Sequence, residues 1–192
     1  MEQTKTAGRG SGKRERLLEG AQRAFHEQGV ERTTLADVAS RADVPLGNVY
    51  YYFKTKDQLV EAALEAHADA MREMLRSAER HRTPRARLKA MVRAFGEQRD
   101  VVAQRGCPVG TLCSELDKRD DELVGGARAA LMVPIDWAER QFREAGRPDA
   151  RDLAVGLFAA YQGIALIANT LRDPSLITRE TRRLERWLDS LT

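Results

Sequence analysis

The spacing of apolar residues predicts helices along the chain. From Lys13 onward, Leu17, Leu18, Ala21, Ala24 and Phe25 recur every three or four positions, as on one face of an amphipathic helix. This helix is expected to end at Gly29, because glycine suits the left-handed backbone that commonly closes a helix. No stretch of useful length shows the alternation of a strand, so the sequence predicts an all-α fold.

Two short helices are expected next, joined by a tight turn. Thr33 or Thr34 can cap the first of them, whose apolar side is Leu35, Val38, Ala39 and Ala42. The turn lies at Asp43–Pro45, and Pro45 fits the first position of the following helix. In that helix Val49 and Phe53 share one face and are expected to pack inward, which leaves Gly47 and Tyr51 pointing away.

Longer helices are predicted in the remaining three quarters of the chain. They run from Lys56 to about Arg80, from Pro84 past Phe95, from Asp120 to Gly146 with a kink at Pro134, from Arg151 to Leu171, and through a final segment with Leu184 and Leu191 on one stripe. The expected organisation is a flexible basic arm at 1–12, a three-helix domain at 13–57 and a larger helical domain at 58–192.

Composition and charge narrow the class of protein. Charged residues make up 32% and hydrophobic residues 42%, which is typical of a soluble globular protein. Residues 1–56 hold ten Lys and Arg against seven Asp and Glu, and the rest hold twenty-two of each, so the net charge of +3 arises beside the two short helices. A basic surplus at that place favours a nucleic-acid partner.

The sequence offers few candidates for a targeting segment, a catalytic site or a metal site. The N-terminus has no apolar core for a signal peptide, and the longest apolar segment, near Leu166, falls short of a membrane span, so a cytoplasmic protein is expected. Cys107 and Cys113 have no ligand-spaced partners and are predicted to be reduced, buried thiols. Three scattered histidines, and the lack of nucleophile or dinucleotide motifs, predict that the chain is not an enzyme and holds no metal or cofactor.

The third predicted helix carries Tyr50, Tyr51 and Tyr52 on a single turn, with Asn48 before them. On a nucleic-acid reader, hydroxyls can bind phosphates, ring edges can meet thymine methyl groups, and an amide can bind adenine or phosphate. Gly47 leaves room for the backbone to approach the DNA. The alternative is that the tyrosines are core or dimer aromatics.

The segment from Thr33 to Lys56, TTLADVASRADVPLGNVYYYFKTK, closely resembles the DNA-binding domain of TetR-type transcriptional regulators. The matching positions are Thr33, Thr34, Asp37, Val38, Ala39, Gly47, Val49, Tyr50, Tyr52, Phe53 and Lys56. The resemblance implies that Thr34 and Lys56 anchor phosphates, that Leu46, Gly47, Asn48 and Tyr50 face bases, and that Tyr51 and Tyr52 touch the backbone.

The segment also departs from the family pattern in three ways. Asp43 replaces the usual turn glycine, which Asp tolerates because its short polar side chain supports left-handed backbone. Pro45 replaces a capping Ser and loses one hydrogen bond. Ala36 and Leu46 replace positions that are frequently polar, so sequence discrimination is expected to depend more on Asn48, Tyr50 and DNA shape.

A shorter resemblance lies in the second half. Gly106–Gly110 with Ser114–Leu116 is similar to the effector domain of the LmrA/YxaF-like branch of these regulators, which implies helices that enclose a cavity. The expected lining is apolar with polar tips, namely Met91, Phe95, Met132, Trp137, Phe158, Tyr161 and Gln162. For each of these residues, a place in a filled core is the alternative.

Small residues suggest where two copies meet. Gly156, Ala160 and Gly163 lie on one side of a predicted helix and allow close helix–helix approach. With Leu184, Trp187 and Leu188 of the last helix they are expected to form half of a four-helix dimer bundle, the alternative being the core of a monomer.

The expected function is therefore a homodimeric, ligand-responsive regulator, most simply a repressor of a palindromic double-stranded DNA operator, released by a small hydrophobic effector and without a membrane partner. A ligand-independent architectural DNA-binding protein is the alternative.

Overall fold

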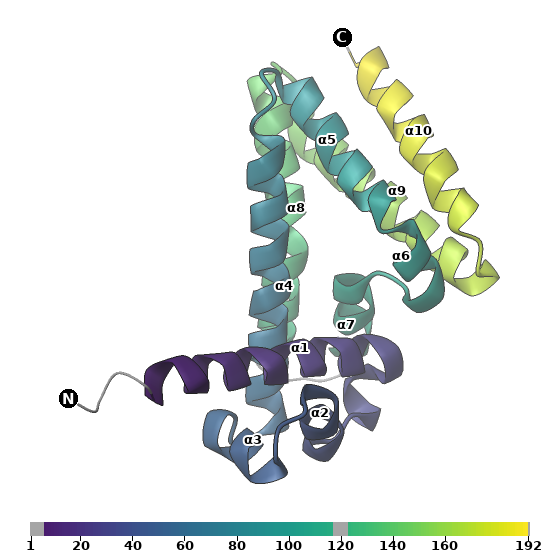
Figure 1. The fold of residues 1–192 in the computed structure, drawn as a ribbon. Coiled ribbons are helices and arrows are strands. Elements are labelled where there is room, and N and C mark those ends of the chain that lie inside the picture. Colours follow the sequence, from purple (N-terminus) through teal and green to yellow (C-terminus); the bar gives the residue numbers. More distant parts are fainter. Residues whose placement is uncertain (1–5, 117–122, 192) are drawn as a thin grey trace. The chain divides into compact units, whose positions relative to one another are not determined.

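The computed structural model describes residues 6–116 and 123–191 (Figure 1). Within these residues the chain forms ten helices and no strand, which confirms the predicted all-α fold. The helices are α1 (Thr6–Arg32), α2 (Leu35–Ala42), α3 (Leu46–Tyr52), α4 (Lys56–Ala78), α5 (Pro84–Glu97), α6 (Arg99–Arg105), α7 (Pro108–Leu116), α8 (Leu123–Glu144), α9 (Ala150–Leu171) and α10 (Pro174–Ser190).

The chain divides into two compact units. The first comprises Met1–Ala66 and Thr111–Ala127, and the second His67–Gly110 and Arg128–Thr192. The boundary within α4 therefore falls later than residue 57. In addition, residues of α7 and of the start of α8 that were expected in the larger domain pack with the N-terminal helices: Leu112 and Leu116 are buried in the same apolar core as Leu17 and Phe25.

In the first unit, α1 begins at Thr6 rather than at Lys13, so residues 6–12 are helical and only residues 1–5 of the expected arm lie outside the described residues. Gly29 interrupts α1 near its end, as the sequence predicted. Its φ of 83° is positive, but its ψ of 164° is extended rather than left-handed helical. Only glycine adopts this conformation readily, because other residues have a Cβ that collides with the backbone there.

The turn between α2 and α3 follows the prediction at Asp43 and differs at Pro45. Asp43 adopts a left-handed backbone, with φ and ψ both 51°. Its N–H, and that of Val44, bond to carbonyls of the last turn of α2. Pro45 precedes the first helical residue instead of occupying it, and no side chain caps α3. The expected loss of one capping hydrogen bond is therefore present.

In the second unit, α10 lies beside α5 and α9, and α6 beside α9 and α10 (Figure 1). The short helix α6 was not predicted, because its seven residues follow α5 almost directly and carry too little periodicity. Pro134 lies inside α8, as expected, whereas the expected start of this helix at Asp120 lies outside the described residues. Cys107 and Cys113 are not joined in a disulfide, and both are half-buried rather than buried.

The expectation that the apolar segment near Leu166 is too short to span a membrane is wrong. The 22 residues of α9 are long and apolar enough to cross a membrane by length and composition. However, Ala154, Leu157, Phe158 and Tyr161 are buried against other helices of the second unit, as in the core helix of a folded domain. The other side of α9 is exposed, and it is described below.

Candidate nucleic-acid interface and ligand cavity

The short helix α3 presents one buried and one exposed face. Val49 is fully buried and Phe53, which ends the helix, is 3% exposed, so both pack inward as predicted. On the other side, Tyr51 is 74% exposed and Tyr50 is 49% exposed. Two adjacent aromatic side chains with this much exposed ring surface are typical of a face that contacts another molecule.

The remaining predicted DNA contacts lie on or beside this face. Leu46 and Gly47 are exposed, and a Cβ built on Gly47 would meet no atom within 4 Å. Asn48 and Tyr52 are half-buried, and the Tyr52 ring stands edge-on to that of Tyr51, 4.9 Å away. The four residues and the two exposed tyrosines therefore form a continuous face on α3. We call it the recognition face.

The helix α2, which braces α3, begins with a reciprocal cap. The Thr34 hydroxyl accepts a bond from the Asp37 N–H at 3.1 Å, and the Thr34 N–H donates to the Asp37 carboxylate at 2.8 Å. The bonds that the Thr34 N–H and the Thr34 hydroxyl donate to the Asp37 carboxylate lower the pKa of Asp37 below its ordinary value, because they favour the charged form. The predicted Thr34 cap is thus confirmed, while its hydroxyl remains on an exposed residue beside the start of α2.

The Lys56 side chain makes contacts within the protein that its predicted role as a phosphate anchor did not include. Its ammonium donates to the carbonyls of Val30 and Glu31, at 3.0 and 3.3 Å, and so holds the end of α1. A lysine has three N–H donors, so one donor remains for a phosphate. Lys56 is therefore a structural clamp in the free protein, in addition to any contact with DNA.

Two basic residues beside α3 were missed by the sequence reasoning. Lys54 is exposed in the turn after Phe53, and its backbone N–H donates to the Gln58 side-chain oxygen at 2.8 Å. The Arg14 guanidinium, from the exposed side of α1, lies 5.4 Å from the centre of the Phe53 ring. The signal for Lys54 was its position in the family segment, whereas only the tertiary structure brings Arg14 to the end of α3.

The second unit contains a partly open cavity of about 140 Å³. Its wall is mostly apolar and comes from α4, α5, α8, α9 and the segment before and at the start of α7. The lining residues are His67, Ala70, Met71, Met74, Phe95, Gln98, Cys107, Pro108, Val109, Ala130, Pro134, Phe158 and Tyr161. An engineered apolar cavity of about 150 Å³ binds benzene, so this volume suits a compact aromatic molecule.

Aromatic rings organise one side of the cavity. Phe95 and Tyr161 stack with centroids 4.3 Å apart, and Phe158 lies edge-on to Phe95 at 6.4 Å. Burial raises the pKa of the Tyr161 hydroxyl far above its ordinary value, and Cys107 beside it adds to the shift. Tyr161 is therefore a neutral phenol among the residues that line the cavity.

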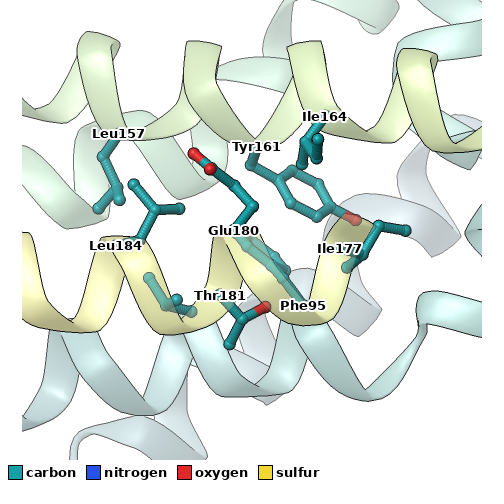
Figure 2. A pocket seen from close by; sticks show the side chains of 9 residues that line it. Phe95, Leu157, Tyr161, Ile164, Ile177, Glu180, Thr181 and Leu184 are labelled. Carbon is teal, nitrogen blue, oxygen red and sulfur yellow. The ribbon is translucent and has the colours of Figure 1, made fainter. Parts of the chain in front are cut away.

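A smaller pocket adjoins the same aromatic pair, where α5, α9 and α10 meet. Figure 2 shows its lining, with Tyr161 and Ile164 from α9, Ile177, Glu180, Thr181 and Leu184 from α10, and Phe95 from α5. Its volume is about 10 Å³. This is at most room for one water molecule, so the larger cavity is the candidate ligand site.

Of the seven predicted pocket residues, three line the cavity, namely Phe95, Phe158 and Tyr161. Met91 is 1% exposed and packs in the core, and the Trp137 indole N–H donates to the Glu79 carboxylate at 2.9 Å. Met132 is half-buried beside Arg151. Gln162 lies just behind the wall, where its amide donates to the Cys107 sulfur at 3.4 Å.

Sequence reasoning missed the α4 contribution of His67, Met71 and Met74. These three residues recur every three or four positions along α4, as one stripe of a helix. A stripe of this kind does not reveal whether it faces a filled core or a cavity, so the pattern gave no signal that could have separated the two.

The predicted dimer residues fall into two groups. Gly156 and Gly163 are exposed and Ala160 is half-buried, and a Cβ built on either glycine would meet no atom within 4 Å. In contrast, Leu184 and Leu188 are 4% and 2% exposed and belong to the core of their own unit. Trp187 is half-buried and packs edge-on against Phe142 at 6.2 Å.

The exposed side of α9 is mostly apolar between Val155 and Leu171. It carries large side chains that are 44–68% exposed among small residues, namely Val155, Leu166, Ile167 and Leu171, with Gly156, Ala159 and Gly163 between them. We call this the α9 face. The exposed side of α10 is instead rich in arginine, including Arg179, Arg182, Arg183 and Arg186.

A recognition face on a short helix, braced by a capped second helix through a tight turn, defines a helix-turn-helix DNA-binding protein. Residues 17–63 match the family model described as bacterial regulatory proteins, tetR family. The HTH-type transcriptional regulator TtgR of Pseudomonas putida is 27% identical over 188 residues, covering 92% of this chain and 88% of the relative. Residues 17–63 therefore match a TetR-family DNA-binding domain, and the chain as a whole is similar to transcriptional regulators of that family.

Two further comparisons agree. The HTH-type transcriptional regulator BetI of Burkholderia thailandensis is 39% identical over 87 residues, 43% of each chain. The crystal structure of regulatory protein TetR from Rhodobacter sphaeroides has a TM-score of 0.79 and 25% identity, and covers 90% of this chain and 96% of that one. The likeness therefore extends over the helical second unit as well as the DNA-binding helices.

Proposed function

We propose that this regulator is a homodimeric repressor that binds a palindromic operator and is released by a small, neutral aromatic effector. The observation that carries the DNA-binding part is the recognition face: Tyr51 is exposed on the side of α3 opposite the fully buried Val49, and Tyr50 is exposed on its flank. Because the protein acts on DNA and the chain has the composition of a soluble protein, we place it in the cytoplasm.

The proposed DNA contact of each residue follows from its position in the helix-turn-helix. Leu46, Gly47, Asn48 and Tyr50, at the start and middle of α3, are proposed to face base edges in the major groove. Tyr51, Tyr52, Thr34 and Lys56 are proposed to contact the phosphate backbone, with Lys54 and Arg14 as additional basic contacts.

The effector class follows from the lining of the cavity. None of the described lining residues is Asp, Glu, Lys or Arg, so a charged ligand would lose its hydration without gaining a partner. Two flexible methionines and a stacked aromatic pair suit a flat apolar ring, and the neutral Tyr161 hydroxyl can bind one polar group on it.

The LmrA/YxaF-like branch is proposed on the segment that carries the resemblance. Gly106–Gly110 includes Cys107, Pro108 and Val109, all of which line the cavity. The segment therefore contributes to the wall of the candidate ligand site, as the resemblance implies.

The α9 face is the proposed dimer surface. It is apolar, it is free of contacts from its own unit at the two glycines, and it lies along a helix of 22 residues. A dimer is needed because the two halves of a palindrome lie about 34–36 Å apart, one turn of DNA. The proposed pairing involves α9 more than α10, since Leu184 and Leu188 are occupied in the protomer core.

The decisive experiment is to select bound sequences from random DNA and map the protected bases with purified protein. A palindrome bound by a dimer, with affinity lowered by neutral aromatic compounds, supports the proposal. Uniform binding to all sequences, unaffected by such compounds, would instead favour the architectural alternative.

We expect the Lys56→Ala variant to bind all DNA sequences more weakly and to lower the slope of log affinity against log salt by about 0.9, as for one lost phosphate contact. Its melting temperature without DNA should also fall, because the Val30 and Glu31 carbonyls lose their donor. Titrations at several salt concentrations, together with thermal melts, measure both effects. A lower melting temperature with an unchanged slope would restrict Lys56 to the structural role.

We expect Ala130→Leu to abolish release by neutral aromatic compounds while operator affinity stays within about threefold. Ala130 lines the cavity, and the larger side chain takes up space that a ring would need. Gel shifts with and without the compounds measure the effect. Ala145→Leu is the matched control, because Ala145 is exposed in the same unit and does not line this cavity. If Ala130→Leu responded like the wild type, this cavity would not be the effector site.

A further inference from the structure

The turn that ends α1 is held by a carboxylate from a helix far along the chain. The N–H of Val30 donates to Glu115 Oε2 at 2.9 Å, and the N–H of Glu31 donates to Glu115 Oε1 at 2.7 Å. Both carboxylate oxygens are therefore engaged by neighbouring backbone donors. Hydrogen bonds to a charged acceptor are among the stronger ones in proteins.

The backbone conformation at Gly29 makes this arrangement possible. With its φ of 83°, Gly29 turns the chain so that the two following N–H groups point toward α7. A Cβ on Gly29 would lie only 3.0 Å from Glu115 Oε2 and 3.1 Å from Glu115 Oε1. The turn and the carboxylate fit together only because residue 29 has no side chain.

Other side chains hold the carbonyl groups of the same turn. Lys56 donates to the carbonyls of Val30 and Glu31, and the Thr33 hydroxyl donates to the Gly29 carbonyl at 2.6 Å. Glu115 from α7 thus binds the N–H groups of this short stretch of backbone, and Lys56 from α4 binds its carbonyl groups. We call this set of contacts the Gly29 clamp.

The clamp lies directly before the helix-turn-helix. Thr34, the cap of α2, follows it in sequence, and Val30 and Thr33 are buried in or beside the core that α2 and α3 share. The clamp therefore fixes the point at which the chain enters α2. Because α2 packs on α1 and on α3, the clamp and the recognition face belong to one group of packed helices.

We propose that Glu115 is a positioning residue for operator binding, which acts by holding the Gly29 clamp and so preorganising α2 and α3. This inference rests on the proposed DNA-binding role of the recognition face. Glu115 is not a DNA contact, because both of its oxygens face the α1 turn and a carboxylate would repel phosphates. Without Glu115, α2 and α3 would have to be ordered when the protein binds DNA, and the cost of this ordering lowers the affinity.

The test compares Glu115→Gln with the wild type on the selected operator. We expect operator affinity to fall about tenfold with no change in salt slope, since no phosphate contact is lost. We also expect the amide hydrogens of Val30 and Glu31 to exchange at least about tenfold faster in the free protein, while those of Leu17 and Val38 keep their protection. A general loss of stability would instead accelerate all four amides.

The matched control is Glu31→Gln, which removes the same unit of charge nearby. The Glu31 side chain is exposed, and its backbone N–H, the group that Glu115 binds, is unchanged. This control should keep the wild-type affinity within about threefold, or bind slightly more tightly because a negative charge near DNA is gone. Gly29→Ala provides an independent way to disrupt the clamp, and it should give the same amide exchange pattern as Glu115→Gln.

The outcomes separate the inference from the function on which it rests. If the wild type bound no preferred sequence, the proposed operator binding would fail. If the wild type bound its operator and Glu115→Gln bound it equally well, the positioning role of Glu115 would be overturned. A Glu115→Gln protein that weakens binding only by unfolding, with all amides exchanging faster, would also overturn it.

Discussion

Leu166→Glu is expected to turn the proposed dimer into a monomer and to weaken operator binding on the order of 100-fold or more. Leu166 is 68% exposed at the centre of the α9 face, so a carboxylate there costs the protomer little. Across a two-fold axis, however, two carboxylates would be brought together in an apolar interface. A monomer then loses the gain from binding two half-sites at once, which is commonly about 10²–10⁴-fold.

Sedimentation analysis and gel shifts on the same preparations measure the two effects together. Val101→Glu is the matched control, because Val101 is another exposed apolar residue of the second unit, 49% exposed and located on α6 rather than on α9. This control should remain dimeric and should bind the operator normally. A Leu166→Glu protein that sediments as a dimer at micromolar concentration would place the interface elsewhere.

The second large effect concerns sequence discrimination. Tyr50→Ala and Asn48→Ala are each expected to reduce the preference for the operator over a variant changed at one base pair by about 1–3 kcal/mol, because each side chain is proposed to contact a base edge. The loss should be confined to particular base positions, which binding to a panel of single-substitution operators would identify.

Tyr51→Ala is the informative comparison for these two variants. Tyr51 is the most exposed of the three tyrosines and is proposed to contact the backbone. Its loss should weaken every sequence in the panel to a similar extent and should leave the preferences in place. If Tyr50→Ala also weakened all sequences alike, α3 would lie in the groove in a different orientation from the one proposed.

Much of the first unit could be predicted from local sequence. The inward orientation of Val49 and Phe53 follows from the helical period, and the structure confirms it. The Thr34 cap and the left-handed Asp43 turn follow from the chemistry of short polar side chains, and both are confirmed. These features depend on residues within one or two turns of each other, which is why the pattern alone was enough.

The cavity and the dimer residues were harder to predict. Phe95, Phe158 and Tyr161 line the cavity, whereas Met91 and Trp137 lie in filled core. All five are apolar residues on amphipathic helices, and periodicity identifies the buried side of a helix without saying whether a neighbour fills the space. Leu184 and Leu188 pose the same difficulty, because a stripe that faces its own core looks the same as one that faces a partner.

The sequence by itself determined that this protein is helical, where the helix-turn-helix lies and which side of α3 is exposed. Only the tertiary structure decided that Glu115 and Lys56 grip the turn before α2 and that Arg14 lies at the end of α3. It also decided that an α4 stripe forms one side of a cavity. The physical reason is the separation of the contacting residues along the chain. Local spacing determines which residues share a helix face, whereas contacts between residues far apart in the chain depend on how those faces pack.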